Sequence, residues 1–149
     1  MKKFLLCLLV VLSFFMVTGC NSHNGKKKMG NIYFAELKDV KKTDSDKGKL
    51  ESGKKWNSVR YVLDGMAVSV VRYENQKIDV VIGNQSNIET RKIEDLEYKY
   101  REFELDSETI MSQYYIQKGD DTYYISATYK NTDANKKVFE SFLESIEVD

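Results

Sequence analysis

The chain of 149 residues has no proline, two cysteines and one histidine, and the last three all lie within its first 23 positions. Residues 24–149 therefore contain neither a thiol nor an imidazole. This absence excludes from that part a Ser-His-Asp or Cys-His nucleophilic site, the usual Cys/His zinc site and a haem held by histidine. We predict that the folded part is not an enzyme and uses no cofactor and no metal.

A glycine-rich phosphate loop and the Rossmann dinucleotide fingerprint are also missing. The charges balance, with 23 Lys and Arg against 23 Asp and Glu. Because there is no basic excess and no basic stripe interleaved with aromatic residues, the sequence indicates no nucleic-acid partner. Ten tyrosines are present, and tyrosine favours half-buried positions in β-sheets.

The N-terminus has the organisation of an export signal. Two lysines precede the apolar run 4–17, which has the length of a signal-peptide core and is short for a membrane-spanning helix. The run ends at Val17-Thr18-Gly19-Cys20, which resembles the lipobox of bacterial lipoproteins. That resemblance implies a diacylglycerol thioether on Cys20 and cleavage between Gly19 and Cys20. An ordinary secretory signal with a chance cysteine is the alternative.

This reading divides the chain into a removed signal peptide, 1–19, a lipidated flexible tether, 20–31, and one domain, 32–149. Each buried methylene of an acyl chain contributes about 0.8 kcal/mol to membrane attachment. We therefore expect the protein on the extracytoplasmic side of the cell membrane, with the membrane as a partner through the lipid on Cys20. The lysines at 26–28 are either solvated or attracted to anionic headgroups, at about 1 kcal/mol each.

Two β-hairpins are the clearest local predictions. Asp64-Gly65 is a favoured type I′ turn between strands from Val59 to Leu63 and from Met66 onward. The second hairpin joins 113–117 to 122–130. Each is expected to place its apolar residues on one shared face. These residues are Val59, Tyr61, Leu63, Met66, Val68 and Val70 in the first hairpin, and Tyr114, Ile116, Tyr123 and Ile125 in the second.

Other segments give less regular patterns. We predict a strand over 77–82, paired with the end of the preceding strand through a turn at Asn75-Gln76. Another strand is predicted over 96–105, with a bulge or break where its apolar parity changes. Residues 41–55 are predicted to be a loop, and residues 32–40 either an edge strand or a short helix.

The C-terminal segment predicts a helix capped by Thr132 or Asp133. Its apolar stripe needs a sheet to cover it, so the predicted fold class is α+β, a twisted antiparallel β-sheet built from hairpins and packed by this helix. The stripe consists of Val138, Phe139, Phe142, Leu143 and Ile146. The ending Tyr123-Tyr124-Ile125, then Phe139, Phe142 and Ser145-Ile146, resembles small sheet-plus-helix domains of exported lipoproteins, such as the PsbP-like sandwich. That resemblance implies binding or assembly at the cell envelope.

Three segments contain residue types that could form a site. Asp44-Ser45-Asp46-Lys47-Gly48 has the beginning of a calcium loop, but lysines stand where an EF-hand requires glycine and glutamate, which favours a solvated segment. The acids between 94 and 106 alternate with aromatic residues, which is typical of the solvent face of a strand rather than of a glycosidase pair. Tyr115 and Tyr124 are expected to face outward, opposite one another, as a candidate partner-binding patch unless another segment covers them.

These observations favour a membrane-anchored, non-catalytic binding or accessory module with a protein or peptide partner. A bacteriocin-immunity or peptide-sequestering lipoprotein is one alternative, based on size and location. A carboxylate-based envelope hydrolase is the other, and it requires two acids with raised pKa in a concave pocket.

Overall fold

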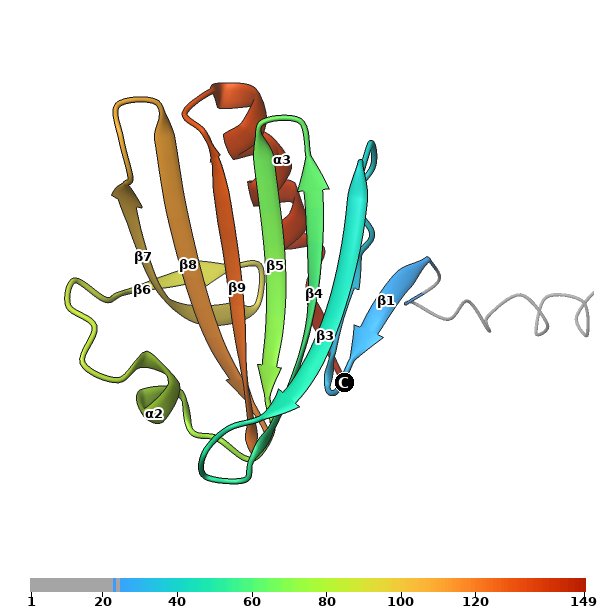
Figure 1. Cartoon of the computed structure of the whole chain (residues 1–149), viewed down its shortest axis with the longest axis vertical. Helices are drawn as coiled ribbons and strands as arrows, with labels where there is room; N and C mark the ends of the chain where they lie inside the picture. Colours follow the sequence, from blue (N-terminus) through green and yellow to red (C-terminus); the bar gives the residue numbers. More distant parts are fainter. Residues whose placement is uncertain (1–22, 24) are drawn as a thin grey trace, which may run out of the picture.

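The computed structural model describes residue 23 and residues 25–149. The predicted signal peptide and Cys20 lie outside these residues, so the predictions made for them stay predictions. In the described part, no helix is both long and apolar enough to cross a membrane. Figure 1 shows a tall, curled antiparallel sheet with one long helix behind it.

Seven strands form the main sheet, in the order β3-β4-β5-β9-β8-β7-β6. The 12-residue helix α3 lies against one face of this sheet, which we call the inner face, and the opposite face is the outer face (Figure 1). This arrangement confirms the α+β class. The strands are β3 (Lys42–Lys49), β4 (Lys55–Leu63), β5 (Met66–Tyr73), β6 (Glu89–Ile93), β7 (Leu96–Glu104), β8 (Thr109–Lys118) and β9 (Asp121–Lys130), and α3 spans Asp133–Glu144.

Both predicted hairpins are confirmed in their register. Leu63 pairs with Met66 and Val59 with Val70 across the first turn, and Tyr114 pairs with Ile125 across β8 and β9. The inner face of these four strands is buried and meets the stripe of α3, where Phe139, Phe142 and Leu143 are at most 2% exposed. The helix begins where predicted, because the Thr132 side chain accepts a hydrogen bond from the Asn135 amide at 3.3 Å.

A small second sheet contains β1 (Lys26–Met29), β2 (Ile32–Ala35) and β10 (Glu147–Val148), in the order β1-β2-β10. The prediction of a flexible tether over 20–31 is therefore wrong for residues 26–31. Met29 joins the core, and the Asn31 amide donates to the Tyr123 hydroxyl at 2.7 Å. Of the two options for 32–40, a strand is correct for 32–35, but β2 is the central strand of the small sheet and not an edge strand, and its Ile32 and Phe34 are fully buried.

The predicted strand over 77–82 is wrong, because Ile78–Ile82 form the short helix α2. The position beside β5 is taken by β9, with Val71 opposite Tyr124. The chain therefore leaves the sheet after Tyr73, and the Asp121 carboxylate accepts the Asn75 amide at 3.0 Å. A five-residue segment with four apolar residues is compatible with either helix or strand, and here the pairing of β5 with the distant strand β9 decides.

Two further strands differ from expectation. The predicted loop over 41–55 contains β3, an edge strand whose residues other than Gly48 are exposed and which pairs along its whole length with β4. Its charges replace the apolar alternation of ordinary strands and protect a sheet edge from further pairing. In β7, the register with β8 is continuous from Lys99 to Glu104, so the predicted bulge is absent there. The apolar alternation of β7 changes face because Phe103 lies on the outer face of the sheet, where it is 36% exposed, and not because an extra residue is inserted in the strand.

Candidate functional site

A groove of about 770 Å³ lies beside α3. Its walls come from the segment between β2 and β3, the β4–β5 turn and α3. Three segments that are distant in sequence meet there because β2 packs against α3 and the β4–β5 turn adjoins the start of α3, where a Cβ on Gly65 would lie 3.7 Å from the Asn135 side chain. We call this concavity the α3 groove.

The floor of the α3 groove is apolar. Phe142 is buried beneath it, Leu37 and Leu63 are partly buried against the core, and Val138 is 39% exposed. The prediction that Val138 lies in the buried stripe of the helix is wrong, because this residue is at the edge of the stripe and faces the groove.

The rim of the groove carries charges of both signs. The Lys41 ammonium group and the Asp64 carboxylate form an ion pair at 3.1 Å, which holds the pKa of Asp64 below its usual range. The rim therefore has no excess of either charge. The rim residues are Glu36, Lys38, Asp39, Lys41, Asp64 and Lys137.

The two tyrosines predicted as a patch are neighbours on the outer face. Tyr115 and Tyr124 are register partners, and their ring centroids are 5.0 Å apart. Tyr115 is only 2% exposed, however, and its hydroxyl donates to the Gln85 side chain at 2.8 Å. The segment after α2 therefore covers it, so the expectation of an exposed pair is wrong for Tyr115, while Tyr124 is half-buried.

The acids between 94 and 106 point in different directions. Glu94 and Asp95 lie in the turn between β6 and β7, Glu97 is on the outer face, and Glu102 is on the inner side. Glu102 accepts hydrogen bonds from the Ser112 hydroxyl at 2.6 Å and the Tyr129 hydroxyl at 3.2 Å. Ser112 is completely buried, so a substrate cannot reach its hydroxyl. Glu102 therefore serves as the hydrogen-bond acceptor of two hydroxyl groups on the inner face, which is a structural role.

The predicted calcium segment lies in β3, where its side chains alternate between the two faces of the strand. Asp44 pairs with Lys42 at 3.0 Å, and within residues 25–149 and at residue 23 no group of three or more His, Cys, Asp or Glu side chains is placed to hold a metal ion.

On the inner side of the sheet, Arg91 of β6 makes a two-pronged ion pair with Glu140 of α3, at 2.8 and 2.9 Å, and also donates to the Tyr114 hydroxyl. This contact fastens the far edge of the sheet to the helix.

Comparisons with known proteins indicate only the fold. No family model matches the chain, and no curated protein matches it. A crystal structure of a protein from Bacteroides thetaiotaomicron VPI-5482 is similar with a TM-score of 0.56 and 12% sequence identity. The match covers 84% of this chain and 48% of that one, so this chain spans about half the length of that structure. The fold thus defines an α+β protein in which one curled antiparallel sheet is packed by a C-terminal helix.

The α3 groove was not predicted from the sequence. Leu37 stands in a charged segment that has no strand or helix pattern, and Leu63, Val138 and Phe142 belong to two separate predicted elements, so no local pattern shows that they meet. The one available signal is Val138, which begins the stripe immediately before Phe139 and so falls at its edge.

Proposed function

We propose that this protein is a membrane-anchored extracytoplasmic lipoprotein that acts as a non-catalytic binding module through the α3 groove. The lipobox-like motif at Val17–Cys20 supports the anchor. The observation that carries the binding role is the groove itself, whose apolar floor leaves Val138 exposed. Its volume of about 770 Å³ falls within the range of about 300–1,000 Å³ that is common for ligand sites.

The chemistry of the groove suits a peptide or protein segment with one or two bulky apolar side chains. The floor accepts those side chains, and the mixed charges of the rim accept polar groups on either side of them. A strongly charged ligand gains little from a rim of balanced charge. This argument favours a partner segment of low net charge.

The state of the carboxyl groups supports binding over hydrolysis. The pKa values of Asp64, Glu147 and Asp149 are lowered because a lysine ammonium group hydrogen-bonds to each. The pKa of Asp106 is lowered because the Glu108 amide donates to it. A general acid requires the opposite shift, so these four carboxylates are poorly suited to protonate a leaving group.

A photo-crosslinking residue at position 138 tests the groove. The matched control is position 80, because Val80 is an even more exposed valine, at 67%, and lies on α2. In intact cells we expect one defined adduct from position 138 and none of the same mass from position 80.

A second measurement uses a known probe and the purified protein. The fluorescence of an apolar dye such as anilinonaphthalene sulfonate is expected to fall in Val138→Asp and to stay unchanged in Val80→Asp. Equal crosslinking from both positions, or equal dye response in both variants, would remove the groove as the binding site.

A further inference from the structure

The charges of the chain are divided between two parts of the fold. Residues 26–60, which form β1 to most of β4, contain eleven Lys or Arg and five Asp or Glu. Residues 64–149 contain ten Lys or Arg and eighteen Asp or Glu. Although the charges of the whole chain balance, residues 26–60 therefore carry a net positive charge and residues 64–149 a net negative charge.

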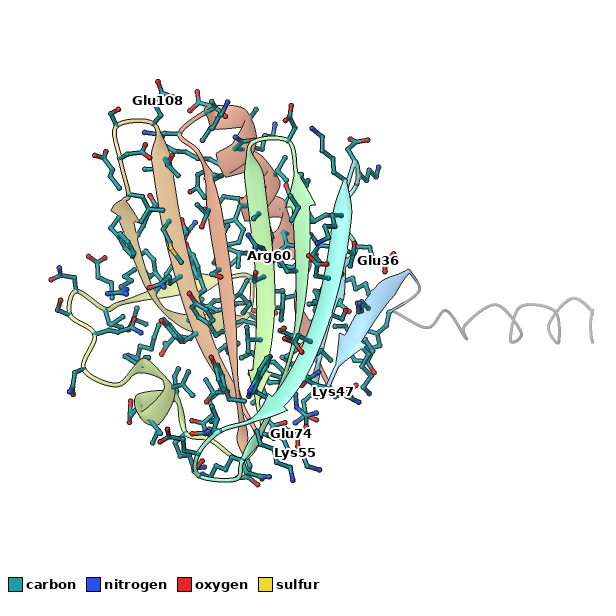
Figure 2. The ribbon with its side chains drawn as sticks, in the orientation of Figure 1. Glu36, Lys47, Lys55, Arg60, Glu74 and Glu108 are labelled. Atoms are coloured by element: carbon teal, nitrogen blue, oxygen red, sulfur yellow. The ribbon has the colours of Figure 1, made fainter. Side chains whose placement is uncertain are left out.

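The two oppositely charged parts of the chain also lie at different sides of the molecule. Figure 1 shows β1, β3 and β4 together at one side of the molecule and β6 and β7 at the other. Lys27 and Lys28 of β1 line one shallow hollow of about 460 Å³ with Lys47 of β3. Lys47 and Lys55 also lie near one another at the lower end of β3 and β4 (Figure 2).

Several of these lysines have no acidic partner within the described residues. Lys26 and Lys28 pair with Glu147 and Asp149, the latter at 2.7 Å, and are therefore compensated. Asp46 lines the same hollow, and Glu74, near Lys55, pairs with Arg72 at 3.3 Å. Among the lysines of β1, β3, β4 and the turn between β3 and β4, five form no ion pair in the described part, and we call them the basic edge: Lys27, Lys47, Lys49, Lys54 and Lys55.

The hollow also offers hydrogen-bonding groups. Ser45, Asn57 and Ser58 line it beside the lysines, and the Asn57 side-chain oxygen is buried with no hydrogen-bond partner in the described structure. An unsatisfied buried acceptor is unfavourable. That oxygen is closed to solvent, so a headgroup can reach the lysines and the Ser45 and Ser58 side chains of the hollow instead. Phosphatidylglycerol, which carries a phosphate and hydroxyl donors, offers a partner to both kinds of group.

The position of the chain start brings this side toward a membrane. The His23 ring stacks on Tyr33 with centroids 3.7 Å apart, and its Nδ1 lies 2.7 Å from the Glu147 carboxylate. Cys20 precedes His23 by three residues, and three residues span at most about 11 Å. A lipid on Cys20 therefore keeps β1 and β2 close to the bilayer surface.

We propose that the basic edge lies against anionic lipid headgroups and that the acidic β6–β7 side faces away from the membrane. The inference rests on the proposed anchor at Cys20. The single tryptophan of the chain, Trp56, adjoins Lys55 in β4 and faces Gly48, between Lys47 and Lys49 in β3. The half-buried Trp56 ring lies over Gly48. Because neighbouring residues of a strand point to opposite faces, the ring is on the other face of β3 and β4 from Lys47, Lys49 and Lys55, at the same edge of the sheet, and therefore reports whether this edge approaches the bilayer.

Trp56 also serves as the reporter in the test. Chain 20–149 contains every described element and one thiol, so Cys20 can be coupled to a maleimide lipid in vesicles without relying on cellular lipidation. The vesicles carry a spin-labelled headgroup that quenches nearby tryptophan. We expect strong quenching of Trp56 in vesicles containing phosphatidylglycerol and weak quenching in phosphatidylcholine alone.

Two triple variants make the comparison specific. Lys27→Gln, Lys47→Gln and Lys49→Gln together should reduce quenching to the phosphatidylcholine level, because each lysine near an anionic surface strengthens the contact about five-fold. Lys92→Gln, Lys130→Gln and Lys136→Gln remove the same charge from exposed positions on β6, β9 and α3 and should leave quenching unchanged. Circular dichroism confirms that both variants are folded.

The outcomes separate this inference from the proposed anchor. Equal quenching in the two lipids, or equal loss in the two triple variants, would overturn the orientation. Lack of fatty-acid label on Cys20 in cells would instead contradict the anchor, whatever the vesicles report.

Discussion

The ring of Tyr115 stacks on that of Tyr124 at 5.0 Å, yet Tyr115 is almost completely buried while Tyr124 is half-buried. The difference arises because the segment after α2 folds over Tyr115, where Gln85 accepts its hydroxyl hydrogen bond. Burial also raises the pKa of the Tyr115 hydroxyl. The pair is therefore part of the packing between the sheet and the α2 segment.

We expect Tyr115→Ala to lower the free energy of unfolding by about 3 kcal/mol, the usual cost of removing a large buried side chain. Tyr124→Ala should cost less, because part of its ring remains in water. Urea denaturation followed by circular dichroism measures both. Equal and small losses in the two variants would mean that the α2 segment does not cover the sheet.

Phe142 anchors α3 to the sheet, with 2% of its surface exposed and its ring 5.8 Å from that of Phe34 in β2. Phe142→Ala should therefore cost about 3–5 kcal/mol in unfolding free energy. Val138→Ala, four residues earlier on the same helix, is the control and should cost under about 1 kcal/mol because Val138 is 39% exposed. Similar costs at both positions would contradict the docking of the helix described above.

The two hairpins could be predicted because their evidence is local. Asp64-Gly65 sets the turn, and the pairing of Leu63 with Met66 follows from it. The neighbour of β5 could not be predicted in this way, because β9 lies about fifty residues further along the chain. The error at Ile78–Ile82 follows from that gap, because a mainly apolar segment immediately after a strand predicts a further strand when the distant partner cannot be seen.

The edge strands and the groove escaped prediction for a different reason. β3 is held by backbone pairing to β4, and its side chains have no apolar alternation to reveal it. The α3 groove depends on segments brought together by the tertiary fold. The charge division at about residue 60, in contrast, is visible in the sequence once the two parts are counted separately.

Gly30 is required where the β1–β2 turn meets the main sheet. Its φ is +59°, and a Cβ there would collide with the Tyr123 hydroxyl and the Arg72 side chain. Gly53 has a similar φ of +79° but open space around it. Both alanine variants carry the strain of positive φ, about 1 kcal/mol.

We expect Gly30→Ala to lose clearly more stability than Gly53→Ala in thermal unfolding, because only Gly30 adds a steric clash. Equal losses would mean that the β1–β2 turn moves freely away from Tyr123. That result would also weaken the argument that places the chain start close to the body.

Glu147 links the C-terminus to the chain start and should make the fold sensitive to acid. Its pKa is lowered mainly because the Lys26 ammonium group hydrogen-bonds to it, with a smaller effect from His23. A carboxyl group with a lowered pKa in the folded state stabilises the fold above its usual pKa, and the effect is lost as pH falls through the folded value. Stability should therefore decline below about pH 4.5.

Glu147→Gln should reduce this decline, measured as the melting temperature between pH 7 and pH 3. Glu144→Gln is the control, because Glu144 forms no ion pair within the described residues. Lys28 also holds the pKa of Asp149 below its usual range. Some fall of the melting temperature in acid should therefore remain in both variants. An identical acid response in wild type and Glu147→Gln would contradict the role of this ion pair.

Cys20 carries the predicted anchor, and its substitution tests the localisation directly. If the Val17–Cys20 motif is processed as in bacterial lipoproteins, Cys20→Ala removes the thiol that receives the diacylglycerol group, so the protein should remain uncleaved or be released through another cut. Growth with a clickable fatty-acid analogue, followed by gel fluorescence, should show label on wild type and none on the variant. Cys7→Ala is the matched control, because Cys7 lies inside the apolar run and should leave labelling intact. Label that persists in Cys20→Ala would show that the lipid is elsewhere, and membrane association without any label would point to an uncleaved N-terminal segment as the anchor.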